Sequence, residues 1–142
     1  MTPQTSVTIL KAGSAILVGF GILIAFAAFP PTAEPTRLLT DIVFWPPDGA
    51  QTGAASETRL FSAITGGVLV GWGVLLWLLI TRVFPRDPET GRFMILASVG
   101  TWFVVDGLGS FAAGAPVNVV LNIGFLAVFV LPLVRPVAIA DS

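Results

Sequence analysis

Hydrophobic residues in this chain fall into four long runs, separated by short segments that are polar or rich in proline. Each run can cross a bilayer as a helix, because about 20 consecutive apolar residues span the hydrocarbon core. The pattern predicts four transmembrane helices, at residues 7–29, 60–81, 93–113 and 116–134. The expected fold class is therefore an all-α membrane protein, with residues 1–142 forming a single four-helix bundle.

The first run has two interpretations. Residues 12–29 hold no charge, and extending the helix back to Val7 gives a full span with Lys11 reaching toward the headgroups. The sequence Ala25-Phe26-Ala27 also matches the small-x-small pattern at which a signal peptide is cleaved. The weakly charged N-terminal region and the length of the apolar run favour a retained helix.

The two polar connections differ in length. Residues 82–92 form a compact one, and residues 30–59 form the longer one. A short amphipathic helix in the membrane interface is predicted over residues 36–45, because apolar side chains recur there with helical spacing, at Leu38, Leu39, Ile42 and Trp45. An irregular loop with accidental periodicity is the alternative. After the fourth run, residues 137–142 are expected to fray.

Charge sets the expected orientation. If residues 82–92 are cytoplasmic, the basic residues divide five inside to two outside, namely Lys11, Arg82, Arg86, Arg92 and Arg135 against Arg37 and Arg59. This division follows the positive-inside rule, so both termini should be cytoplasmic and residues 30–59 periplasmic. The net charge of -1 offers no basic surface for nucleic acid. The expected partners are the lipid bilayer and another membrane protein or a second copy.

The composition excludes most catalytic chemistry. Hydrophobic residues make up 55% of the chain and charged residues 11%, whereas a typical globular chain has about 25% charged residues. The chain has no cysteine, histidine or tyrosine, so the usual ligands of zinc, haem and copper and the commonest general base are missing. We therefore expect no enzyme activity, no cofactor and no metal site.

One polar cluster is expected inside the membrane. Asp106 is the only charge in residues 93–134, and a turn at residues 113–116 folds the fourth helix back on the third. Asn118 and Asn122 would then reach the depth of Asp106 and Ser110, each pair being one helical turn apart. The cluster could hold the hairpin in register, or Asp106 could titrate as a site for a proton or cation. Glu57 and Arg59, at the outer end of the second helix, form a possible ion pair near it.

Small residues predict close helix packing. The second helix carries Ala63, Gly67 and Gly71 at four-residue spacing, and Gly107 lies on the third helix. The first helix has a similar seam, at Ser14, Val18, Gly21, Ala25 and Ala28. Such rows let backbones approach closely. The seams could meet within one chain or between two copies, and a groove for a cofactor or pigment is the alternative for the glycines.

The glycine-rich helix also carries a resemblance. The segment RLFSAITGGVLVGWG, residues 59–73, resembles the second helix of small uncharacterised bacterial four-helix inner-membrane proteins, and the order of spans resembles the wider DoxX-like group. The resemblance implies a multi-pass protein of the bacterial inner membrane and transfers no activity. Small multidrug resistance transporters are a poorer match, because their essential glutamate lies in the first helix, where this chain has no acid.

Two functions are compatible with these features. The first is a non-enzymatic accessory or structural subunit of a membrane complex, or a small bundle that associates with itself. The second is a proton- or cation-coupled small transporter that acts as a dimer and uses Asp106 as its coupling site.

Overall fold

The structure is a computed structural model that describes residues 2–134. These residues form helices and connections and contain no strand. The helices are α1 (Pro3–Phe26), α2 (Glu34–Val43), α3 (Ser56–Leu78), α4 (Pro88–Ala112) and α5 (Pro116–Val134). A short 3-10 turn, η1 (Pro30–Thr32), precedes α2, and a π-helical segment, η2 (Leu79–Val83), continues α3. Arg135 and residues 137–142, for which predictions were made above, lie outside the described residues.

Four segments are long and apolar enough to cross a membrane, which confirms the four predicted spans. They are Gln4–Phe26, Ser56–Val83, Pro88–Ala112 and Pro116–Val134. The fold is thus that of a multi-pass, all-helical membrane protein. Which side each connection faces stays a prediction.

The first, second and third spans begin a turn or more before their predicted starts, and side-chain caps precede the first and the third. The Thr2 hydroxyl accepts a hydrogen bond from the Thr5 amide at 3.2 Å, and the Asp87 carboxylate accepts one from the Thr90 amide at 3.0 Å. Proline at the first turn, as at Pro88, loses no helical hydrogen bond. Hydropathy underestimates the length of such helices, because their first turns are polar. The fourth span begins and ends where predicted.

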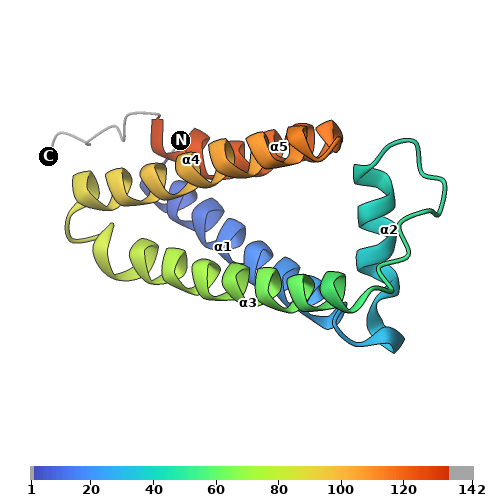
Figure 1. Cartoon of the computed structure of the whole chain (residues 1–142). Coiled ribbons are helices and arrows are strands. Elements are labelled where there is room, and N and C mark those ends of the chain that lie inside the picture. The colour runs from blue at the N-terminus through green and yellow to red at the C-terminus, as the bar shows by residue number, and fades with distance from the viewer. Residues whose placement is uncertain (1, 135–142) are drawn as a thin grey trace, which may run out of the picture.

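The four long helices form two pairs. α1 packs along α3, α4 packs along α5, and the pairs meet mainly through α1 and α5. Figure 1 shows the pairs closest beside the turn between α3 and α4 and separating toward the opposite end, where α2 stands. The resulting shape is an open V, and α2 contacts α1 and α5 across its mouth.

The buried core lies at the closed end of the V. It combines the first half of α1, the last part of α3 with η2, the first half of α4 and the end of α5, through Leu10, Leu17, Leu76, Ile80, Phe84, Ile95, Val99, Phe129 and Leu133. Tight packing reaches the turn itself, since a Cβ on Gly91 would lie 2.7 Å from the Phe84 Cα. The closed end is therefore the most tightly packed part of the bundle.

The α1–α3 contact is made within one chain, as one of the two alternatives predicted. Its glycines are Gly21, Gly66 and Gly73: a Cβ on Gly21 would lie 2.8 Å from the Gly66 carbonyl oxygen, and one on Gly73 would lie 2.7 Å from Val18 Cγ2. Backbone approaches backbone along this seam, which only residues without a Cβ allow.

Two glycines of the predicted row on α3 take no part in packing within the chain, and contact of this row with a second copy stays a prediction. Gly67 and Gly71 are exposed, and a Cβ on either would meet no atom within 4 Å. Ala63 is half-buried, and a Cβ on Gly107 would lie 4.0 Å from Val119 Cγ1, an ordinary contact between α4 and α5. Gly66 and Gly67 point about 100° apart around the helix axis, so spacing alone cannot tell which of them faces α1.

The short helix in the long connection is confirmed, two residues earlier than predicted. α2 begins at Glu34, with Pro35 in its first turn, and ends at Val43. It cannot continue far, because Pro46 and Pro47 disfavour the helical conformation of the residues before them. Trp45 follows the helix and is 67% exposed.

Candidate functional site

The hairpin of α4 and α5 brings the predicted polar residues together. Asp106 and Ser110 lie on α4, Asn118 and Asn122 lie on α5, and we call these four residues the polar cluster. The turn depends on Gly114, whose φ of 77° lies in the left-handed region that favours glycine. The Ala115 amide then donates to the Ser110 carbonyl at 2.9 Å, which closes the end of α4.

One carboxylate oxygen is the centre of the polar cluster. Oδ2 of Asp106 accepts from the Asn118 side-chain amide at 3.0 Å, from the Ser110 hydroxyl at 3.4 Å and from the Asn122 side-chain amide. Asn118 also donates to the Ser110 hydroxyl at 2.8 Å. All four residues are half-buried. The acid that would be costly in hydrocarbon is thus satisfied by two helices at once.

The orientation of Asn118 follows from its partners. A carboxylate can only accept hydrogen bonds, so the amide must direct its NH₂ group at Asp106. Both of its N–H bonds are then used, one on Asp106 and one on Ser110. The Asn118 carbonyl oxygen takes part in neither bond, so it is left as an acceptor for another group.

The possible ion pair of Glu57 and Arg59 is not formed. Within residues 2–134 the one ion pair joins Glu34 and Arg37. Glu57 instead accepts from the Ser56 hydroxyl at 3.1 Å. Residues two apart on a helix do not face each other, which accounts for the missing pair. Arg59 forms no ion pair with Asp106 either, because α3 and α4 separate toward this end of the bundle (Figure 1).

A cavity lies beside the polar cluster at the open end of the V, and we call it the α2 cavity. Its volume is about 330 Å³, and α1, α2, α3 and α5 all contribute to its walls. Asn118 lines it from α5, and a row of hydroxyl groups lines it from α2 and α3, at Thr36, Thr40, Thr58, Ser62 and Thr65. A second cavity of about 200 Å³ shares four of these residues on its walls and extends toward the long connection.

Sequence reasoning did not find the α2 cavity. One signal was present, because Thr58, Ser62 and Thr65 recur at helical spacing on α3. The threonines of α2 complete the wall only in the folded chain. The Thr36 hydroxyl donates to the Leu23 carbonyl of α1 at 3.1 Å, which holds the two helices together at the cavity.

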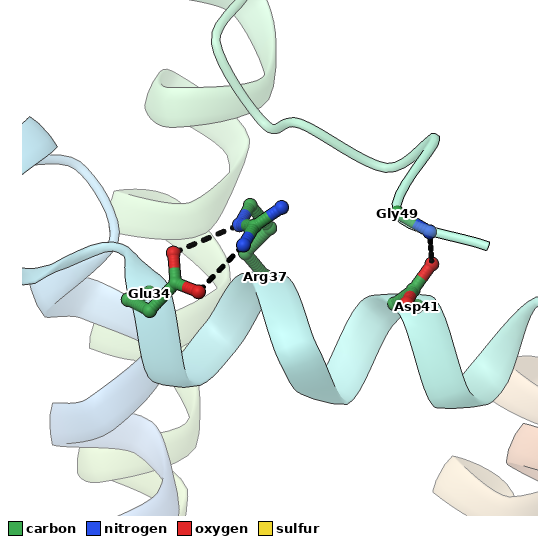
Figure 2. A network of polar contacts seen from close by, with 4 residues as sticks. All are labelled: Glu34, Arg37, Asp41 and Gly49. Carbon is green, nitrogen blue, oxygen red and sulfur yellow. Dashed lines mark hydrogen bonds and ion pairs between the residues drawn. The ribbon is translucent and has the colours of Figure 1, made fainter. Parts of the chain in front are cut away.

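Charged residues fix α2 and the connection that follows it (Figure 2). The Arg37 guanidinium donates to both oxygens of Glu34, through Nε at 2.8 Å and through Nη2. These hydrogen bonds hold the pKa of Glu34 below its ordinary value. Asp41 accepts from the Gly49 amide at 2.9 Å and from the Asp48 amide at 3.2 Å, so the connection folds back over the helix.

Aromatic side chains bridge the two helix pairs just below the polar cluster. The Trp72 indole on α3 donates to the Ser98 hydroxyl on α4 at 2.6 Å. The ring centroids of Trp72 and Trp102 lie 5.5 Å apart, and those of Trp102 and Phe125 on α5 lie 5.6 Å apart. These rings fill the space between the pairs and separate the polar cluster from the core at the closed end.

Within residues 2–134, no three Asp, Glu, His or Cys side chains gather closely enough to form a candidate metal site. Comparisons with protein-family models, with curated proteins and with solved structures gave no match. The resemblance to the DoxX-like group stays a prediction.

Proposed function

We propose that the protein is a multi-pass protein of a bacterial inner membrane, where it acts as a non-enzymatic accessory or structural subunit. In this proposal it associates with another membrane protein or with a second copy of itself. The polar cluster supports a structural role, because each of its three donor side chains contacts the one carboxylate that joins α4 to α5. The open V supports the association, since only 11% of the most apolar part of α4 is buried within the chain.

Purification in a mild detergent, followed by mass spectrometry and light scattering, tests this proposal. We expect the tagged chain to elute in a complex of defined stoichiometry, either with one co-purifying membrane protein or as an oligomer. Elution as a monomer without a partner, after crosslinking in intact membranes, would contradict it.

The exposed glycines of α3 give matched variants for the same experiment. A Cβ on Gly67 or Gly71 would meet no atom of this chain within 4 Å and both residues are exposed, so the fold should tolerate Gly67→Leu and Gly71→Leu. Loss of the complex in these variants, with an unchanged melting temperature, would place the contact on this side of α3. Gly19→Leu on α1 is the control, because its surroundings are equally open.

A second candidate function is proton- or cation-coupled transport by a dimer, with Asp106 as the coupling site. The observation that favours it is the position of Asn118, which lines the α2 cavity while donating to Asp106. All three donors contact Oδ2, which leaves Oδ1 without any of them. The carboxylate therefore lies one side chain away from an accessible space.

Proton flux into proteoliposomes separates the two candidates. With an internal pH dye and an imposed membrane potential, a transporter should show flux that Asp106→Asn abolishes without loss of folding. A structural role predicts no flux above that of empty liposomes and a modest loss of stability in the same variant.

A further inference from the structure

The hydroxyl groups in the α2 cavity have most of their protons engaged. Thr40 donates to the Thr36 carbonyl at 2.8 Å, Ser62 donates to the Thr58 carbonyl at 2.9 Å, and Thr36 donates to α1. A hydroxyl whose proton is engaged presents only its lone pairs. These three side chains therefore offer acceptors to a molecule in the cavity.

Asn118 adds an acceptor of the same kind. Its two N–H groups are committed to Asp106 and Ser110, and its carbonyl oxygen is not used in either bond. The polar wall of the cavity thus has acceptors on α2, α3 and α5. The hydroxyls of Thr58 and Thr65 also line the wall and can either donate or accept. A ligand that brings its own donors can therefore pair with every polar group of this wall.

The charge around the cavity favours a cation. None of the residues that line it is ionisable, and Asp106 lies directly behind Asn118. Asp106 has no basic partner within residues 2–134. Arg37, which lines the adjoining cavity, is held by Glu34 and is therefore neutralised locally. In a medium of low dielectric constant the remaining negative charge attracts a cation over several ångströms.

The other wall of the cavity is apolar. Phe20 and Ile24 contribute to it from α1, Leu39 and Val43 from α2, and Phe61 from α3. These side chains can cover a hydrocarbon or aromatic body, and the two phenylalanine rings can also face a cation. The cavity is therefore amphipathic, with an acceptor wall opposite a hydrophobic one.

We propose that the α2 cavity binds an amphiphilic primary amine in its ammonium form. The three N–H donors of the ammonium group would pair with the acceptor wall, and the apolar body would lie against the phenylalanines. This inference goes beyond the subunit role proposed above. It concerns binding at equilibrium, so it can fail or hold whether or not the chain has a protein partner or transports anything.

Three small probes that share a 2-phenylethyl body test the recognition. Binding of 2-phenylethylamine, 2-phenylethanol and (2-phenylethyl)trimethylammonium to the full chain in nanodiscs can be measured by calorimetry. We expect saturable binding of the primary amine, about tenfold tighter than the alcohol, which lacks the charge. The trimethylated probe keeps the charge and loses the donors, so it should bind about fivefold more weakly than the amine.

Variants locate the bound amine. Thr40→Val combined with Ser62→Ala removes two acceptors from the wall and should raise the Kd of the amine about fivefold or more. Thr81→Val is the matched control, because the Thr81 hydroxyl makes the same type of bond, to the Trp77 carbonyl at 2.7 Å, far from the cavity. Asp106→Asn should raise the Kd of the amine and leave that of the alcohol unchanged.

Several results would overturn the inference. They are absence of saturable amine binding, equal binding of amine and alcohol, and an equal effect of the double variant and Thr81→Val. The comparison of the three probes needs no variant, so the inference stays testable even if a substituted chain fails to fold.

Discussion

The two helix pairs of this protein are held together by different interactions. α1 and α3 meet through glycine backbones, with no room for a Cβ at Gly66 or Gly21. α4 and α5 are joined at their turn end by polar side chains that converge on Asp106. Close backbone contact depends on shape and tolerates no added atom, whereas a polar cluster depends on matched donors and acceptors and tolerates change of volume. The two pairs should therefore respond to opposite kinds of mutation.

The largest effect is expected at Gly66. A Cβ there would lie 2.5 Å from the Gly21 carbonyl oxygen and would also overlap the Ala25 amide. Because both atoms belong to backbone, Gly66→Ala should lower the free energy of unfolding by about 3 kcal/mol. The measurement is unfolding in mixed micelles with increasing SDS.

Gly67→Ala is the matched control for that prediction. The same methyl group meets no atom one residue further along, so the variant should be neutral or slightly more stable, as alanine favours helix over glycine. Equal losses in the two variants would show that the seam does not run through Gly66.

The turn of the polar hairpin should give the next largest effect. Gly114 has a φ of 77°, and an L side chain in this region costs about 1 kcal/mol. Gly114→Ala should lower stability by this amount, measured by the same SDS titration. Gly124→Ala lies in α5, where a Cβ has open space, and should not lower stability. If Gly114→Ala left the stability unchanged, the left-handed conformation at this position would not be needed for the hairpin.

The polar contacts themselves should contribute less than the turn. In a double-mutant cycle of Asp106→Leu and Asn122→Leu we expect a coupling energy of about 0.6 kcal/mol, the average for polar contacts between membrane helices. Each single variant should lose more than the coupling, because it leaves a partner without its hydrogen bond. A coupling energy of zero would show that the contact between Asp106 and Asn122 does not hold α4 against α5.

The smallest effect concerns pH. Hydrogen bonds from Thr90 hold the pKa of Asp87 below its ordinary value of 3.8. The cap of α4 should therefore contribute fully above that ordinary value and be lost as the pH falls through the lower, folded pKa. Thermal unfolding below about pH 4 should show this loss. In Asp87→Asn, which still accepts a hydrogen bond without titrating, the loss should be smaller, and the part that remains comes from other acids with a lowered pKa such as Glu34.

Much of the fold could be predicted from local features. The spans follow from runs of apolar residues, and the turn at Gly114 and Pro116 follows from residues that end one helix and begin the next. The partners of Asp106 were also accessible, because one hairpin with a short turn allows only one register. Boundaries were less accurate, since capped first turns such as the one at Asp87 are polar.

Other features depended on the whole fold. The sequence by itself determined how many times the chain can cross a membrane and which acid needs a partner there, because hydrophobicity and helical spacing are properties of neighbouring residues. Only the tertiary structure decided that Gly66 rather than Gly67 faces α1, and that α2 joins α3 and Asn118 around a cavity. The rotation of a helix about its axis and the angle between two pairs are set by all contacts together, and no single segment encodes them.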